Sequence, residues 1–290
     1  MSYNSTGLDC LKTCWIRDLI KTCKTDFFQL QEHFKTTKSL DNFFRREFPS
    51  FDSFMTPGYR EPFQDAGRAK GGLAQLSCNQ LDIKKEKIPT KHWRNQAQIL
   101  HLDNYRIIWI NCYFPTDPQI LQFNDQELSE VLEDIENTLD KNVFDDCILG
   151  GDLNFDISRR SGFANTVRDF LSRLELFSVW DKFPADFTHL HTDGKNTSTI
   201  DHFFVNQRLL DLVQDAGPVH LGDNPSRHSP IMMKIKIPEL KTKISQVVTP
   251  PPRKPAWYKA AQADKDHYTS LLDSRLRALT VPDSLQCQNV

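Results

Sequence analysis

A carboxylate and an amide stand two residues apart behind a pair of glycines. Asp152 and Asn154 follow Gly150 and Gly151, which end a short apolar run. Two glycines permit a close approach of the backbone, and side chains at i and i+2 of an extended segment point to the same side. Such a pair can hold a hard cation together with a phosphate oxygen. A Gly-Asp turn closed by an Asx hydrogen bond explains the same residues, so the segment alone leaves both interpretations open.

Two further polar residues end apolar, strand-like runs. Glu32 closes the run that starts at residue 26, and Tyr113 closes the run that starts at residue 106, just before Phe114 and Pro115. Functional side chains of α/β sheets gather at strand ends. A surface rim would also account for Glu32, and a packed aromatic side chain would also account for Tyr113.

Two serine-led segments precede apolar runs later in the chain. Ser198 and Asp201 belong to the first segment, and Ser226 and His228 belong to the second. A single histidine such as His228 is more often structural than catalytic, although imidazole can exchange a proton near neutral pH. The His-Leu-His run at residues 189–191 allows a metal pair, and a solvated loop is the favoured interpretation.

In chain order, these segments resemble the endonuclease/exonuclease/phosphatase superfamily over about residues 1–238. The family pattern is an early Asn, Gln-Glu, a strand-end Tyr-x-Pro, Gly-Asp-x-Asn, Ile-Asp-His or Ile-Asp-Tyr, and finally Ser-Asp-His. The matching positions are Asn4, Glu32, Tyr113, Asp152, Asn154, Asp201 and His228. The resemblance implies an α/β fold, a four-layer αββα sandwich of two mixed β-sheets flanked by helices. It also implies phosphoester cleavage that depends on Mg²⁺ or Mn²⁺.

The resemblance further implies a metal centre at the strand ends. By motif, Glu32 ligates the cation, and Asn4, Asp152 and Asp201 lie at the metal. Asp152 is also expected to orient or deprotonate water. A phosphodiester is already anionic, so its cleavage requires a cation, hydrogen-bond donors and an activated water.

Other matched residues are expected at the phosphate. Asn154 would hold the scissile phosphate, and Tyr113 would donate a hydrogen bond to one of its oxygens. His228 would act as a base or stabilise the transition state. The further residues expected to bind substrate are Arg68, Ser198 and Ser226.

Two features narrow the resemblance to the apurinic-like endonuclease domain of non-LTR, LINE-type retrotransposons. Gly-Arg-Ala-Lys-Gly-Gly at residues 67–72 resembles a segment of those endonucleases, and residues 253–287 are similar to the connector that leads to reverse transcriptase. The resemblance implies DNA as the partner and nicking of one strand. It also implies a reverse transcriptase domain in the intact element, of which this chain would be a fragment or degenerate copy.

The last motif departs from the family pattern. Arg227 stands where the family has an aspartate before the histidine. A guanidinium cannot accept a hydrogen bond from His228, and its charge lowers the pKa of a nearby imidazole. We therefore expect impaired activity, and an inactive remnant is one alternative function. A phosphatase or phosphodiesterase for small or lipid phosphates is the other.

The elements that must position these residues alternate along the chain. Apolar spacing is helical over residues 8–24, 37–47, 125–140 and 163–177. Short apolar runs predict strands over residues 26–32, 96–102, 106–114, 146–150, 200–205 and 231–237. Asp103-Asn104 is expected as a hairpin turn, and residues 50–72 as loop with short strands. This alternation favours two mixed sheets stacked face to face, with helices outside.

The organisation changes near residue 240. Pro250–Pro252 cannot join a helix or a central strand. We expect a catalytic domain over residues 1–240, a Pro-rich basic linker over 241–258 and a helical tail over 259–290. A tail of this length does not fold alone.

Bulk composition fits a globular protein of the nucleus or cytoplasm that is not secreted. Of 290 residues, 39% are hydrophobic and 26% are charged, which suits one large α/β domain. The sequence has neither the roughly 18-residue apolar run of a membrane helix nor the pattern of a secretory signal. Its seven cysteines form no Cys-x-x-Cys pair, so reduced thiols are expected. A net charge of −2 neither supports nor excludes nucleic-acid binding, and the oligomeric state stays open.

Overall fold

The structure, a computed structural model, describes residues 1–36, 40–60, 68–102, 105–116, 125–237 and 261–277. The chain divides into two units, Met1–Ile244 and Ser245–Val290. Both large sheets lie in the first unit, and the second contains helix α7 (Gln262–Arg277). The expected linker over residues 241–258 lies outside the described residues.

The first sheet joins the beginning of the first unit to its end. The short strand β1 pairs in parallel with β2 and antiparallel with β14, and the remaining neighbours are antiparallel, so the sheet is mixed. In spatial order its strands are β13 (Val213–Pro218), β14 (Ile231–Ile235), β1 (Ser2–Asn4), β2 (Phe27–Gln31), β4 (Leu73–Cys78) and β3 (Phe51–Thr56).

The second sheet is built from the middle of the chain. Its strands β7 and β8 run parallel and its other neighbours run antiparallel. In spatial order its strands are β5 (Lys84–Ile88), β6 (Asn95–Leu102), β7 (Tyr105–Tyr113), β8 (Asp146–Asp152), β12 (Asp201–Val205) and β9 (Phe177–Ser178). A separate two-stranded ribbon pairs β10 (His189–Leu190) with β11 (Thr197–Ser198).

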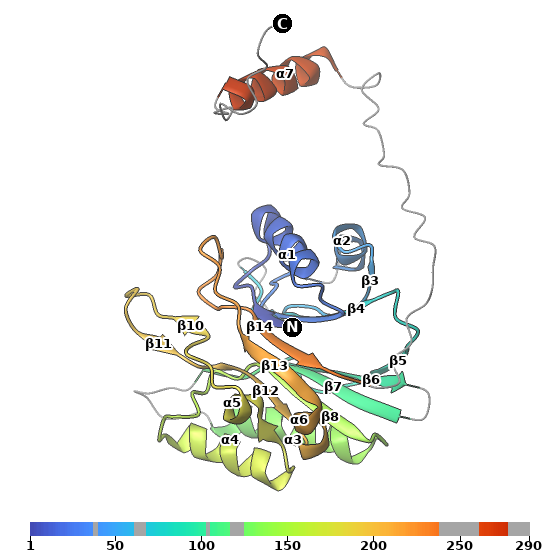
Figure 1. The fold of residues 1–290 in the computed structure, drawn as a ribbon, viewed down its shortest axis with the longest axis vertical. Helices are drawn as coiled ribbons and strands as arrows, with labels where there is room; N and C mark the ends of the chain where they lie inside the picture. The colour runs from blue at the N-terminus through green and yellow to red at the C-terminus, as the bar shows by residue number, and fades with distance from the viewer. Residues whose placement is uncertain (37–39, 61–67, 103–104, 117–124, 238–260, 278–290) are drawn as a thin grey trace, which may run out of the picture. The chain divides into compact units, whose positions relative to one another are not determined.

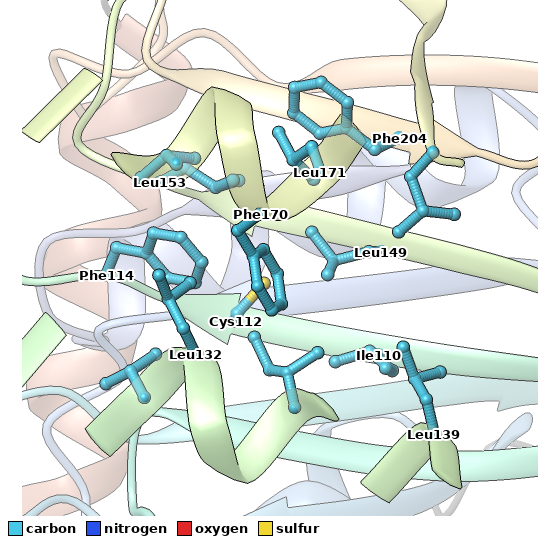
Figure 2. Close-up of a cluster of buried hydrophobic side chains, with 14 of the residues drawn as sticks. Ile110, Cys112, Phe114, Leu132, Leu139, Leu149, Leu153, Phe170, Leu171 and Phe204 are labelled. Carbon is cyan, nitrogen blue, oxygen red and sulfur yellow. The ribbon is translucent and has the colours of Figure 1, made fainter. Parts of the chain in front are cut away.

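Helices cover the outer face of each sheet, as Figure 1 shows. Helices α1 (Cys10–Thr22) and α2 (Leu40–Glu47) pack on the first sheet through a cluster that includes Ile16, Phe28 and Phe44. Helices α3 (Asp125–Asp140) and α4 (Gly162–Arg173) cover the second sheet through Leu132, Leu139 and Phe170, which meet Ile110 and Leu149 (Figure 2). Two short helices, α5 (Val179–Lys182) and α6 (Gln207–Leu212), border a third apolar cluster.

Polar side chains join the two sheets across their inner faces. Gln31 donates to the Asn111 side-chain oxygen at 2.7 Å, and Gln75 donates to the Trp109 carbonyl at 2.9 Å. The Trp109 indole donates to Gln29 in turn. A buried amide without a partner costs free energy, so these bonds favour one placement of the sheets relative to each other.

The expected four-layer sandwich of two mixed sheets is confirmed. Within residues 50–72, where loop and short strands were predicted, β3 is a full six-residue strand. Strands β4, β5 and β13 were not predicted, because they carry no clear alternation or end in Pro218. The expected hairpin of β6 and β7 is confirmed, although its turn at residues 103–104 lies outside the described residues.

The state of the cysteines and the character of the helices can be compared with what the sequence predicted. Every cysteine in the described segments is a free thiol, and Cys112 and Cys147 are buried. None of the helices in those segments combines the length and the apolarity that a membrane crossing requires.

Candidate active site

Three candidate residues stand side by side on neighbouring strands of the second sheet. Tyr113 ends β7, Asp152 ends β8 and Asp201 begins β12. Asp152 is the register partner of both Tyr113 and Asp201. Because β12 runs antiparallel to β8, its first residue lies next to the last residues of the parallel strands β7 and β8.

The backbone of β8 approaches β7 so closely just before Asp152 that position 151 requires a glycine. Gly151 has a φ of +143°, and a Cβ built on it would lie 1.9 Å from the Cys112 carbonyl oxygen on β7. Beyond Asp152 the chain turns sharply, since Asn154 has a φ of 48° and donates its backbone N–H to Asp152 Oδ1 at 2.9 Å. The Asx turn considered for this segment is thus present, and it lies at the strand end with the other candidate residues.

The first sheet adds two residues to the same place. Asn4 ends β1 and donates from Nδ2 to Asp152 Oδ2 at 2.8 Å, while its own Oδ1 accepts the Thr6 N–H. Glu32 follows β2 with a φ of 54°, and its Oε1 accepts the Tyr113 hydroxyl at 2.9 Å. The Asn4–Asp152 and Tyr113–Glu32 bonds span the two sheets, so the site forms only when the sandwich is assembled.

His228 lies between two buried carboxylates. Its Nδ1 is 2.9 Å from Asp201 Oδ2 and 3.2 Å from Oδ1, and its Nε2 is 3.9 Å from Asp152 Oδ2. A carboxylate only accepts hydrogen bonds, so the Nδ1 proton of His228 points to Asp201. This arrangement fixes both the tautomer and the orientation of the ring.

The charges of this cluster shift its proton affinities. Burial alone lowers the pKa of His228, but Asp201 and Asp152 outweigh burial and raise it to about 9. Burial raises the pKa of Asp152, and Asp201 adds to the rise, while His228 and Asn4 oppose it. Burial also raises the pKa of Tyr113, and nearby Glu32 and Asp152 raise it further. The imidazole is thus charged at neutral pH, and the tyrosine keeps its proton.

The expectation that His228 lacks an orienting acid is wrong. The side chain of Arg227 is exposed, whereas His228 is buried, because successive side chains of an extended segment point to opposite sides. Asp201 supplies the carboxylate. Asp201 and Asp152 outweigh burial and raise the pKa of His228, whereas burial lowers the pKa of neighbouring His189 and Arg227 adds to that lowering.

The three residues expected to bind substrate occupy different surroundings. Ser226 bonds through Oγ to the Asn4 carbonyl at 2.9 Å and accepts the His228 N–H, so it ties the last loop to β1. Ser198 is buried in β11. Arg68 is exposed, with its guanidinium carbon 4.0 Å from the centre of the Phe34 ring.

Three further residues support the site, and none of them was assigned this role from the sequence. Thr188 Oγ1 accepts the backbone N–H of Asp201 at 2.9 Å, and the Asn224 side chain donates to the His228 carbonyl at 2.8 Å. The His189 ring lies 4.6 Å from the His228 ring, so the solvated loop favoured for residues 189–191 is wrong for His189. Thr188 and His189 act through partners distant in the chain, which spacing cannot reveal.

The donor set is compatible with a hard divalent cation. Asp152, Asp201 and His228 are buried, and one candidate ligand atom of each lies within 4.8 Å of the others. Because His228 is protonated, the two carboxylates are the available ligands of this group. Carboxylate oxygens are the ligands that Mg²⁺ and Mn²⁺ favour. Glu32 adds a third carboxylate next to this group through its hydrogen bond with Tyr113. Such a site can bind an anionic phosphate, orient water and neutralise developing charge.

Solved structures match the fold, whereas no family profile and no curated protein matches the sequence. The AP endonuclease LMAP from Leishmania major has a TM-score of 0.66 at 15% identity, covering 82% of this chain and 87% of that one. The 3′ phosphatase NExo from Neisseria, bound to a product DNA hairpin, has 0.62 at 16%, covering 81% and 98%. The endonuclease domain of TRAS1, a telomere-specific non-LTR retrotransposon, has 0.58 at 16%, covering 82% and 97%. At these identities the likeness concerns the fold.

Proposed function

Because this chain has the fold of the endonuclease/exonuclease/phosphatase superfamily, we propose that it is a metal-dependent phosphodiesterase that nicks one strand of DNA. The observation that carries the proposal is the pair of contacts Asn4–Asp152 and Asp201–His228 at one point of the sandwich. They combine carboxylates, a charged imidazole and neutral donors, and this set suits cleavage of an anionic phosphodiester.

In this proposal, separate side chains of the protein stabilise charge, accept a proton and bind the phosphate. His228, held as a cation by Asp201, stabilises the negative charge that grows on the phosphate oxygens. Asp152, whose pKa is raised by burial, takes the proton from the attacking water, since a base works best when its pKa lies near the working pH. Asn154 donates a hydrogen bond to the phosphate, and Tyr113 does so once its single hydroxyl proton turns from Glu32 to the substrate.

The cation would be held by Glu32 and Asp152, with Asn4 beside them. When bound, Mg²⁺ or Mn²⁺ supplies Lewis acidity and lowers the pKa of the attacking water. We assign Asp201 to His228 instead of the metal, because both carboxylate oxygens lie within 3.2 Å of Nδ1.

We also propose a retrotransposon origin. Two observations support it: the Gly-Arg-Ala-Lys-Gly-Gly run at residues 67–72 and the similarity to the TRAS1 domain. Exposed Arg68 in this run is available to a DNA phosphate. Association with a reverse transcriptase domain stays a prediction, because most of the connector-like segment lies outside the described residues.

Nicking of supercoiled plasmid tests the proposal. We expect open circles with Mg²⁺ or Mn²⁺, none in excess EDTA, and recovery when the cation is restored. Nicking that persists in EDTA would contradict the metal-dependent mechanism. Release of phosphate from small esters without nicking would support the phosphatase alternative, and the lack of both activities would support an inactive remnant.

A further inference from the structure

Arg94 directly precedes β6 and lies against the end of β7. Its Nη1 donates to the carbonyl oxygens of Tyr113 and Phe114, at 3.3 Å each. Its own carbonyl accepts the Tyr113 N–H at 2.9 Å. Its guanidinium carbon lies 4.9 Å from the centre of the Tyr113 ring. Arg94 therefore contacts both the backbone and the ring of Tyr113.

Two more aromatic rings, Trp93 and Tyr59, extend the packing around Arg94 away from the site. The Arg94 guanidinium carbon lies 4.3 Å from the centre of the Trp93 ring, and Trp93 stacks on Tyr59 at 5.4 Å with an interplanar angle of 11°. Gly71 makes room for the indole, because a Cβ there would lie 2.3 Å from Trp93 Cζ3. Tyr113 is thus the last member of a packed series of rings around one guanidinium.

Helix α3 holds Arg94 in this position. Glu127 accepts from Arg94 Nε at 2.8 Å, and only 12% of the arginine side chain is exposed. About two turns further along the helix, buried Asp134 accepts the backbone N–H groups of Lys91 and His92. Because the loop and the side chain have separate anchors, the guanidinium has little freedom to move.

We infer that Arg94 is a positioning residue that fixes the Tyr113 ring so that its hydroxyl points to Glu32 and the scissile phosphate. The inference rests on the proposed function, which assigns Tyr113 to the phosphate. A small displacement of a donor costs much of its contribution to the rate. A planar guanidinium can stack and donate in fixed directions, and an ammonium group cannot replace it.

The other end of β7 offers a matched control. Tyr105 begins the strand, and the guanidinium carbon of Arg208 lies 4.5 Å from the centre of its ring. Arg208 is paired with Asp146 at 3.0 Å. This pair repeats the tyrosine–arginine–acid arrangement at the opposite end of the strand from Tyr113.

The test is single-turnover nicking of supercoiled plasmid at saturating DNA. Arg94→Met should lower the rate roughly tenfold or more, part of the 10²–10³ that loss of a transition-state donor costs, with half-saturation changed less than about twofold. Arg94→Lys should not restore the rate. In a Tyr113→Phe background Arg94→Met should add little, and Arg208→Met should nick as the unaltered protein does. If Arg94→Met does not fold, Glu127→Gln replaces it in the test, and we expect this variant to lose less of the nicking rate.

Fluorine NMR of 3-fluorotyrosine at position 113 gives a readout that needs no activity. We expect one sharp resonance in the unaltered protein, broadening or splitting with Arg94→Met or Glu127→Gln, and no change with Arg208→Met. Unchanged spectra, additive rate losses with Tyr113→Phe, or full rescue by lysine would each overturn the inference. If the unaltered protein does not nick but the spectra change as expected, the proposed function fails and the positioning role stands.

Discussion

At the scale of single residues, the orientation of His228 depends on which carboxylate can reach its ring. The neighbouring position 227 cannot, because its side chain leaves the extended segment on the opposite side. Asp201 reaches it from the start of β12, where Thr188 fixes the backbone N–H. Asp201, which is distant in sequence, therefore orients the His228 ring, the role that the motif comparison assigned to position 227.

Asp201→Asn should reduce single-turnover nicking strongly. An uncharged amide cannot hold His228 as a cation, and the equivalent change in a serine protease costs about 10⁴-fold. We expect a loss of about 10²–10⁴ with a folded protein. Glu86→Gln is the control, since Glu86 makes a similar contact to His101 on β5 and β6, away from the site. Equal rates for Asp201→Asn and the unaltered protein would refute the role of Asp201.

Arg227→Asp provides the contrasting substitution. Because the Arg227 side chain is exposed, we expect the nicking rate to change less than about threefold, below 1 kcal/mol of barrier. A tenfold rise would instead restore the interpretation of Arg227 as damage to the site.

At the scale of elements, the strand ends are shaped by residues with positive φ. Gly151→Ala should destabilise the protein by about 3 kcal/mol or more, because the new Cβ would collide with β7 at a φ that L-residues avoid. Urea unfolding measures the change. Gly162→Ala is the control: nothing lies within 4 Å of its Cβ, and alanine favours the first turn of α4. Equal stabilities for the two variants would contradict the account of β8.

The loop after β2 should make stability depend on pH. His33 is fully buried, its Nδ1 accepts the Lys35 N–H, and burial lowers its pKa to about 4. The unfolded chain takes up this proton near pH 6.5, so the stability present above that pH is lost as pH falls towards 4. We expect about 2 kcal/mol less stability near pH 5 than near pH 7.5 from this residue.

Urea titrations of His33→Leu and the unaltered protein at both pH values measure this contribution. The variant should be less stable at neutral pH and should lose less on acidification. An unchanged slope in His33→Leu would mean that another group causes the acid sensitivity.

At the scale of the whole molecule, we expect the tail to be separable from the catalytic domain. The first unit contains both sheets, and in the second unit Tyr268, Leu271 and Leu272 of α7 are exposed. Limited proteolysis should therefore cut near residues 241–258 and leave a product of about residues 1–240 that unfolds within about 2 °C of the full chain. Protection of the tail, or a large drop in Tm on its removal, would show that it packs on the domain.

The sequence by itself determined the types and order of the main elements and the identity of most candidate residues. Hydrophobic periodicity is a local property, so α1, α3 and the β6–β7 hairpin follow from a few consecutive residues. Motif order then led to the αββα sandwich, which the topology confirms. Short strands without alternation, such as β5 and β13, offered no such local pattern.

Only the tertiary structure decided how the candidate residues are paired. Asn4 meets Asp152, and Tyr113 meets Glu32, across two sheets whose placement depends on buried bonds such as Gln31–Asn111. These partners are far apart in the chain, and their contact depends on strand register and on how the sheets stack. A sequence shows which side chains can form hydrogen bonds. Which of several chemically equivalent partners a side chain meets is decided by the folded structure. The reason is that a hydrogen bond forms only where the backbone brings donor and acceptor within about 3 Å.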